Sequence, residues 1–310
     1  MSTPRSFNLI LPVGTQVVTR VEVQGADGRT LQPRGALGVV VQSPVDNLHA
    51  YDVEFPDGTR HRLKRGELTI RKQAQRAGLE REALPGDVDL QEFVILEVVV
   101  GSRAYGLEQE GSDTDRRGIY LPPAELHWSL WGVPEQLEND ETQEVYWELQ
   151  KFLVLALKAN PNVLEVLYSP LVERASPVAQ ELLTMREVFL SKLVFQTFNG
   201  YVMSQFKKLE QDLRNQGAIK WKHAMHLVRL LVTGITILEE RWVPVRVDAH
   251  RERLLAIRRG EVEWEEINRW RLELHGRFDA AYTKTTLPER PDYDRVNAFL
   301  LSARRAALSL

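Results

Sequence analysis

The strongest constraint on the fold of this chain is one strand-like run with two turns after it. The turns contain Gly101-Ser102 and Gly111-Ser112. Val94–Val100 is rich in β-branched residues and has the length and composition of a buried strand. It ends on Gly101-Ser102, where the backbone can approach a ligand closely because glycine has no Cβ. After a short spacer, Ser112-Asp113-Thr114-Asp115 leads into a second predicted strand over 118–121. Alternate residues of a strand share a face, so Asp113 and Asp115 are expected to project side by side.

Asp113 and Asp115 together predict a site for a divalent metal ion. Paired carboxylates are hard oxygen ligands that suit Mg²⁺, with Mn²⁺ as the alternative, and Mg²⁺ usually shares its shell with substrate phosphates. The hydroxyl of Ser102 and the amides of Gly101-Ser102 are expected to contact phosphate oxygens, as in a backbone anion nest, and Arg103 adds a cation. The alternative is an Asx turn, in which the two carboxylates bond only to the local backbone.

Three segments resemble the signature of the polymerase-β-type nucleotidyltransferase superfamily: GSRAYG at 101–106, SDTDRRGIY at 112–120 and NPNVLE at 160–165. They resemble one branch in particular, the bacterial and phage polymerase-β-like proteins of RNA-repair pathways. The resemblance runs from about Phe93 to the C-terminus. It implies an α+β palm with a helical domain behind it, and transfer of a nucleoside monophosphate from an NTP to an acceptor hydroxyl. The expected acceptor is an RNA or tRNA 3′ end, and a protein side chain or a small molecule is the alternative.

Nucleotidyl transfer normally uses a third carboxylate, and the sequence offers three candidates for it. Glu144, in a third predicted strand over 142–147, is the preferred candidate for both catalysis and metal binding, and Glu141 and Glu148 are the alternatives. Glu148 is better interpreted as a residue at the start of a helix, where the helix dipole stabilises its charge. The choice matters because a missing third carboxylate favours a second class of protein, a non-catalytic nucleotide- or RNA-binding protein.

The C-terminal half is predicted to be helical, because apolar residues recur every three or four positions. The expected helices cover 149–157, 163–167, 178–190, 192–215, 219–241, 251–258, 263–284 and 293–308. Lys222, His226 and Arg229 share one face of the helix at 219–241, and this cationic stripe is expected to bind the β- and γ-phosphates. The superfamily carries a similar helix, which supports the same interpretation.

Other charged residues of this half are assigned different roles. Lys207 is a further candidate for nucleotide contact, while its neighbour Lys208 points in a different direction. The pairs Arg258-Arg259 and Arg304-Arg305 are expected to face solvent. Glu165 is expected to brace the palm rather than to take part in catalysis.

Residues 1–75 are predicted to form a separate small β unit. Short runs rich in Val, Tyr and Phe alternate there with turn signals, which is typical of a small barrel or sandwich. Residues 35–40 and 51–58 resemble part of a KOW- or SH3-like barrel. The basic end of this unit is either a surface for RNA or DNA phosphates or an edge strand that is protected by charge. It carries Arg60, Arg62, Lys64 and Arg65.

Composition limits the remaining possibilities. The chain has 310 residues and no cysteine, so it is long enough for more than one domain and has neither disulfides nor thiolate metal sites. The formal net charge of −3 argues against wholesale coating of nucleic acid and leaves room for local basic patches. No apolar run reaches the roughly 20 residues of a membrane span. We therefore expect a cytoplasmic protein. The patterns described above divide it into the small β unit at 1–75, a linker at 76–89, a palm at 90–175 and a helical domain at 176–310.

Overall fold

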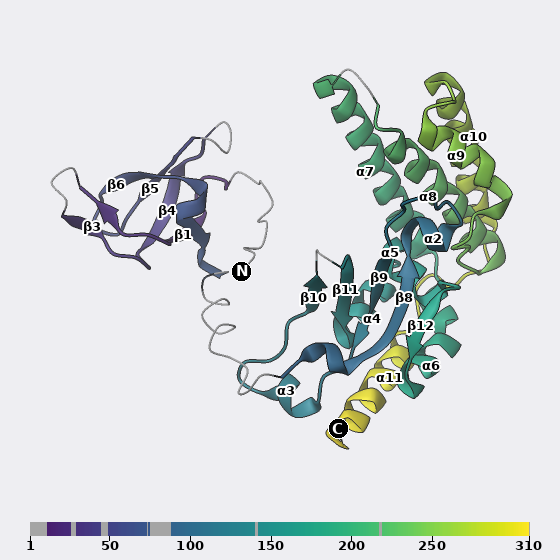
Figure 1. Cartoon of the computed structure of the whole chain (residues 1–310), viewed down its shortest axis with the longest axis horizontal. Helices are drawn as coiled ribbons and strands as arrows, with labels where there is room; N and C mark the ends of the chain where they lie inside the picture. The colour runs from purple at the N-terminus through teal and green to yellow at the C-terminus, as the bar shows by residue number, and fades with distance from the viewer. Residues whose placement is uncertain are drawn as a thin grey trace. The chain divides into compact units, whose positions relative to one another are not determined.

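The computed structural model describes residues 11–25, 29–44, 49–72, 74, 88–139, 142–216 and 219–309. The chain divides into two compact units, Met1–Val88 and Asp89–Leu310, and each has its own hydrophobic core (Figure 1). Most of the predicted linker at 76–89 lies outside the described residues, and so does Glu141. Among the helices that are described, none is long and apolar enough to cross a membrane.

The N-terminal unit is built on a five-stranded antiparallel sheet in the order β6-β5-β4-β1-β7. Its strands are β1 (Gln16–Thr19), β4 (Leu37–Gln42), β5 (Tyr51–Glu54), β6 (Arg60–Leu63) and β7 (Leu68–Ile70). A separate ribbon pairs β2 (Val23–Gln24) with β3 (Thr30–Gln32), and the 3-10 turn η1 (Arg65–Glu67) precedes β7. An all-β unit is confirmed. A closed barrel is not found, because no pairing in the described part of this unit joins the edge strands β6 and β7.

The basic residues predicted to contact RNA lie on and beside the edge strand β6. Two of them form ion pairs with carboxylates of β5: Arg60 with Glu54 at 2.7 Å and Arg62 with Asp52 at 3.1 Å. Arg65 donates to a backbone carbonyl within the unit, and Lys64 is exposed. Charged side chains on an edge strand discourage pairing with a further strand. Arg60 and Arg62 therefore fit edge protection, and their side chains are still 66% and 82% exposed.

The second unit contains a mixed five-stranded sheet in the order β10-β11-β9-β8-β12. The strands are β8 (Val94–Val100), β9 (Asp115–Tyr120), β10 (Gln136–Asn139), β11 (Glu144–Glu148) and β12 (Val172–Ala175). Among the described strands of this sheet, β9 and β11 are parallel neighbours and the other pairs are antiparallel. The predicted strand at 94–100 is confirmed. The edge strands β10 and β12 were not predicted, because neither contains a buried residue and both lack an apolar alternation.

Helices pack with this sheet around one continuous core that runs through the whole unit. The longer helices are α4 (Leu149–Leu157), α5 (Pro161–Tyr168), α6 (Pro177–Thr184), α7 (Leu193–Gln216), α8 (Trp221–Glu240), α9 (Arg251–Arg259), α10 (Trp264–Lys284) and α11 (Tyr293–Ala306). Short helices and 3-10 turns are α2 (Gly101–Tyr105), α3 (Ala124–Trp128), η2 (Leu90–Phe93), η3 (Arg186–Phe189), η4 (Asp248–His250) and η5 (Ala307–Ser309). The helix expected over 178–190 ends earlier, at Thr184, and continues as η3.

A buried ion pair fixes the C-terminal helix to the start of α4. The Glu148 carboxylate accepts from the Gln150 amide and so caps α4, which confirms the predicted helix start. Its other oxygen pairs with Arg304 of α11, and the two side chains are 6% and 9% exposed. The expectation that Arg304 faces solvent is therefore wrong, while Arg305 is exposed.

Candidate active site

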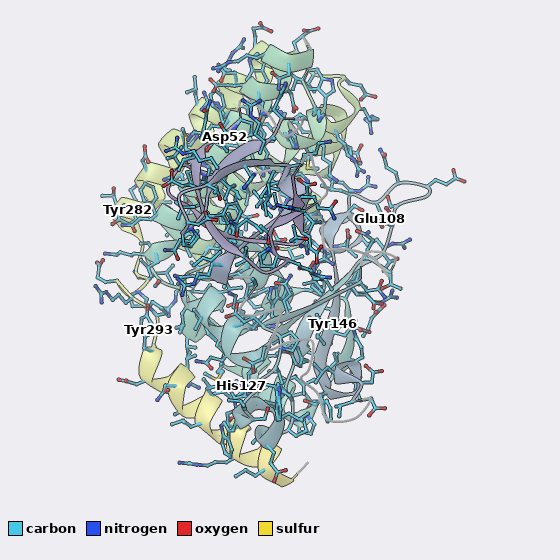
Figure 2. The ribbon with its side chains drawn as sticks, turned by 90° about the vertical axis from the view of Figure 1, so that its left-hand side faces the viewer. Asp52, Glu108, His127, Tyr146, Tyr282 and Tyr293 are labelled. Carbon is cyan, nitrogen blue, oxygen red and sulfur yellow. The ribbon has the colours of Figure 1, made fainter. Side chains whose placement is uncertain are left out.

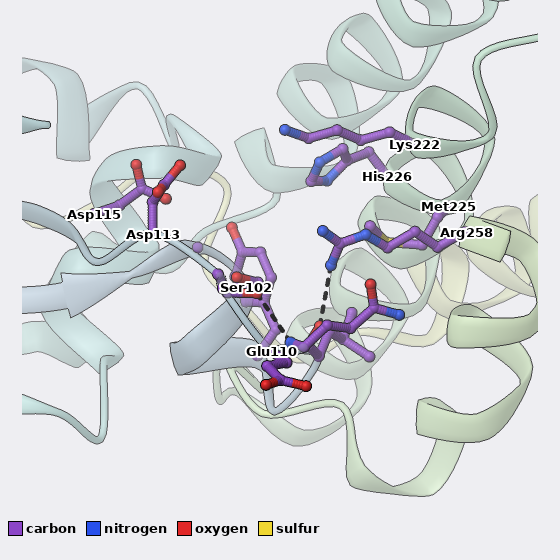
Figure 3. A pocket seen from close by; sticks show the side chains of 14 residues that line it. Ser102, Glu110, Asp113, Asp115, Lys222, Met225, His226 and Arg258 are labelled. Carbon is purple, nitrogen blue, oxygen red and sulfur yellow. Dashed lines mark hydrogen bonds between the residues drawn. The ribbon is translucent and has the colours of Figure 1, made fainter. Parts of the chain in front are cut away.

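A pocket of about 360 Å³ lies between the turn after β8, the loop that enters β9, and helices α8 and α9 (Figure 3). Six residues that the sequence analysis selected line it together: Gly101, Ser102, Asp113, Asp115, Lys222 and His226. In Figure 3, Asp113 and Asp115 stand on one side of the pocket, and Lys222, His226 and Arg258 extend from the other. Residues more than a hundred positions apart are thus brought to one site.

Gly101 is required by the way β8 turns into α2. Its φ is +70°, in the left-handed region that favours glycine. A Cβ at this position would lie 2.5 Å from Asp115 Oδ2, closer than real Cβ atoms approach a neighbour. Because glycine has no Cβ, the backbone of this turn can lie directly against the Asp115 carboxylate. The close approach expected from Gly101-Ser102 in the sequence is therefore seen at this neighbour.

The two aspartates sit at the beginning of β9 and line the same side of the pocket (Figure 3). Asp115 is the first residue of the strand, and Asp113 lies in the preceding bend and is exposed. Arg117 Nη2 lies 3.9 Å from Asp115 Oδ1, a long ion pair. Within the described residues neither carboxylate accepts a bond from the local backbone. The pair thus remains available to a ligand, unlike the carboxylates of an Asx turn.

Arg103 holds this loop in place instead of reaching into the pocket. Its guanidinium donates to the carbonyl oxygens of Ser112 at 2.9 Å and Asp113 at 3.3 Å. The Ser112 hydroxyl in turn accepts from the Gln109 amide at 2.9 Å. Arg103 was predicted to bind nucleotide, but it is not among the residues that line the pocket. Lys207 is exposed on α7 and does not line it either.

The cationic stripe predicted for α8 is only partly formed. Lys222 and His226 line the pocket, but Arg229 is buried in an ion pair with Glu165 and does not. Burial, followed by the charges of Arg229 and Lys222, lowers the pKa of His226 to about 3. His226 is therefore neutral near pH 7, where it offers a hydrogen bond but no charge.

Arg258 of α9 is a pocket residue that the sequence analysis missed. It was expected to face solvent, but its side chain enters the pocket and Nη1 donates to the Leu107 carbonyl at 3.0 Å. Its neighbour Arg259 pairs with Glu261 and is exposed, as expected. Arg258 and Lys222 together give the wall opposite the aspartates a positive charge.

Glu144 does not lie with the two aspartates. The parallel register of β9 and β11 places Glu144 beside Arg116, and Asp115 lies on the opposite face of the sheet. Tyr146 lies two residues further along β11 and shares the face of Glu144 (Figure 2). Burial and the neighbouring Glu97 raise the pKa of Tyr146, and the charge of Glu144 adds a smaller increase. The predicted trio of Asp113, Asp115 and Glu144 is therefore not brought together.

The donor set nevertheless fits one Mg²⁺ ion that shares its shell with a substrate. No group of three His, Asp or Glu residues that could hold a metal occurs in the described part of the chain. Mg²⁺ commonly uses one or two protein carboxylates and takes its other ligands from phosphates and water. Asp113 and Asp115 supply the two carboxylates, and the turn at Gly101 leaves room beside them.

Comparison with known proteins relates this site to one family. Residues 72–302 match the family described as RlaP, RNA repair pathway DNA polymerase beta family. The chain belongs to this family. The resemblance seen in the sequence is thereby confirmed, and both walls of the pocket fall within the matched residues.

One curated relative supports the match over a shorter stretch. The uncharacterized protein YcgL of Bacillus subtilis (strain 168) is 36% identical over 97 residues, which cover 30% of this chain and 37% of that protein. The RlaP family match begins at residue 72, so most of the N-terminal unit lies outside it.

Proposed function

We propose that this chain transfers a nucleoside monophosphate from an NTP to a hydroxyl group, and that the acceptor is an RNA 3′ end. The observation that carries the proposal is the pocket itself, in which paired aspartates face Lys222 and Arg258 across a glycine-serine turn. The family match is a second, independent support.

The reaction breaks a phosphoanhydride bond of the NTP and forms a phosphodiester bond to the acceptor. The acceptor oxygen bonds to the α-phosphorus of the NTP, the bond to the β-phosphate oxygen breaks, and pyrophosphate leaves with the electron pair. The hydroxyl proton passes to solvent. A bound Mg²⁺ ion would supply charge neutralisation on the phosphate oxygens in this chemistry. Asp113 and Asp115 would hold that ion.

The protein's own groups act mainly by binding and orientation. Gly101 and Ser102 line the pocket, and we assign their backbone amides and the Ser102 hydroxyl to hydrogen bonds with phosphate oxygens. Lys222 and Arg258 offset the negative charge of the triphosphate and of the leaving pyrophosphate. Neutral His226 adds a hydrogen-bonding group beside them. Such pre-organised donors are among the largest contributions to catalysis of reactions in which charge develops.

A non-catalytic nucleotide-binding role is a second candidate. It is favoured by one observation, that Glu144 lies on the other face of the sheet and no three-acid group occurs in the described residues. A chain of this kind would bind NTP through the same pocket without turning it over.

The experiment that separates these candidates is an incubation of the full chain with each α-³²P-labelled NTP, Mg²⁺ and total bacterial RNA. The proposal predicts label in RNA from the wild type and none from Asp113→Ala or Asp115→Ala protein that keeps its melting temperature. Label in protein would indicate a protein acceptor. Bound nucleotide without transfer under any metal would support the non-catalytic role.

RNA recognition by the N-terminal unit is part of the proposal and has its own test. Removal of residues 1–75 is expected to weaken the binding of RNA more than that of NTP. Equal RNA affinity with and without these residues would show that the unit has another role.

A further inference from the structure

A buried polar triad connects three helices behind the pocket. Its members are Tyr105 at the end of α2, Glu165 in α5 and Arg229 in α8. Counted over the whole residue, they are 7%, 4% and 4% exposed. The Tyr105 hydroxyl donates to Glu165 Oε2 at 2.6 Å, and Arg229 Nη1 donates to Glu165 Oε1 at 2.5 Å. The Arg229 guanidinium also lies 3.9 Å from the centre of the Tyr105 ring, a cation–π contact. Each member therefore contacts both of the others.

Two of these helices carry opposite walls of the pocket. Tyr105 follows Ser102 by three positions on the single turn of α2, and its ring lines the pocket. Arg229 follows His226 by three positions on α8 and lies further along the same helix than Lys222. Glu165 accepts hydrogen bonds from Tyr105 of α2 and from Arg229 of α8, and it does not line the pocket. It is therefore the link through which the phosphate-binding turn and the cationic helix are held in register.

A gain in folding stability does not explain why the buried triad is built from polar side chains. A buried ion pair contributes little net stability, because desolvation of the charges offsets their attraction, and apolar side chains of similar volume often replace it without loss. Directional hydrogen bonds to a carboxylate define one relative position of the groups that they join. Arg229 Nε has no partner in the described part of the chain. Another buried ion pair in this unit, Glu148–Arg304, also leaves an arginine nitrogen without a partner in the described residues. What distinguishes the triad is its place, since Tyr105 and Arg229 belong to the helices that carry the two walls of the pocket.

We propose that the Tyr105–Glu165–Arg229 triad positions the turn at Gly101-Ser102 against Lys222 and His226, so that one nucleotide contacts both walls of the pocket. The inference rests on the proposed function, since the two walls are those assigned to the triphosphate. None of the three residues takes part in the bond exchange. They act through the groups that they place, and a misplacement of about 1 Å is enough to slow catalysis about 100-fold.

The same unit contains a matched control. Glu148 and Arg304 form a second buried ion pair, with side chains 6% and 9% exposed, compared with 5% for both members of the Glu165–Arg229 pair. Neither Glu148 nor Arg304 lines the pocket. Glu165→Gln and Glu148→Gln each remove one carboxylate charge from a buried arginine and keep nearly the same side-chain shape. The two substitutions therefore perturb similar buried ion pairs at different places, although Glu148 also caps α4 and Glu165 also accepts from Tyr105.

The test compares both variants, and Tyr105→Phe, as full chains at a temperature where each is folded. We expect Glu165→Gln and Glu148→Gln to lower the melting temperature by a similar amount, about 10 °C. Only Glu165→Gln should lower kcat/KM for the NTP, by about 10-fold or more per folded molecule. Tyr105→Phe removes one hydroxyl and should lower kcat/KM with little change in melting temperature. Arg229→Lys should not restore full activity, because an ammonium lacks the planar fork and ring contact of the guanidinium.

The outcomes distinguish this inference from the proposed function. Equal kcat/KM in Glu165→Gln and Glu148→Gln would overturn the positioning role while leaving the proposed activity intact. If Glu165→Gln does not fold, wild-type kcat/KM in Tyr105→Phe would overturn it in the same way. Failure of the wild type to bind an α,β-methylene NTP analogue or to turn over any NTP would instead overturn the proposed function.

Discussion

Replacement of Gly101 by alanine tests the geometry of the pocket through a single added methyl group. The new Cβ would lie 2.5 Å from Asp115 Oδ2, whereas ordinary contact begins at 3.4 Å. The Asp115 carboxylate, which lines the pocket and is 34% exposed, is the group that has to move, by about 0.9 Å. A displacement near 1 Å at a reacting site costs about 100-fold in rate. The left-handed backbone at φ +70° adds a cost of about 1–2 kcal/mol in stability for any side chain.

Gly132→Ala provides the control that separates strain from displacement. Gly132 has φ +65°, a Cβ there meets nothing within 4 Å, and the residue does not line the pocket. Both variants should lower the melting temperature by about 2–8 °C. Steady-state assays with labelled NTP should show a kcat about 100-fold lower in Gly101→Ala and unchanged in Gly132→Ala. Wild-type kcat in Gly101→Ala, or equal losses of kcat in the two variants, would refute the reasoning.

Three further predictions concern single side chains. Glu144→Gln should keep most of the activity, because Glu144 faces away from Asp115. A kcat as low as that of Asp115→Ala would contradict this prediction. Glu141→Gln tests the alternative third carboxylate. Lys222→Met should raise the KM for NTP about 10-fold or more through loss of a charge-assisted contact, while Lys207→Met, on an exposed helix position, should not. His226 has its pKa lowered to about 3 from 6.5, so between these pH values the unfolded chain binds a proton that the folded chain does not. The free energy of unfolding should therefore fall as the pH drops below 6.5, by about 2 kcal/mol at pH 5 from this group. Urea unfolding of wild type and His226→Gln at pH 7 and pH 5 measures the difference, and a difference that does not change with pH would count against a buried neutral histidine.

Local signals in the sequence were sufficient to predict half of the pocket. The β-branched run, the glycine at its end and the two aspartates lie within about twenty residues, and their arrangement follows from strand alternation and glycine chemistry. The helical half was also recognisable, since its apolar periodicity is strong. Lys222 and His226 were selected because residues four apart share a helix face.

The rest depended on contacts that no local pattern encodes. Arg258 reaches the pocket because α9 packs on the loop after α2, and its hydrogen-bond partner Leu107 is 151 residues away in the sequence. Arg229 shares the face of Lys222 and His226, but one helical turn further along it is covered by α2 and α5. Helical spacing defines a face and does not say which part of that face is covered.

Glu144 shows how sensitive a strand-based prediction is to register. A shift of one residue moves a side chain to the other face of a sheet. The parallel pairing of β11 with β9 sets that register, and a propensity for strand does not predict it. The face of Glu144 therefore became clear only from its pairing with Arg116.

The central claim, that one pocket holds the metal and the triphosphate, is tested most directly by diffraction. Crystals of the full chain with Mn²⁺ and an α,β-methylene NTP analogue can be measured at the manganese absorption edge. The account predicts an anomalous peak bound by Asp113 and Asp115, with the triphosphate lying between the Gly101-Ser102 turn and Lys222. A nucleotide bound elsewhere, or a metal peak away from the two aspartates, would contradict it.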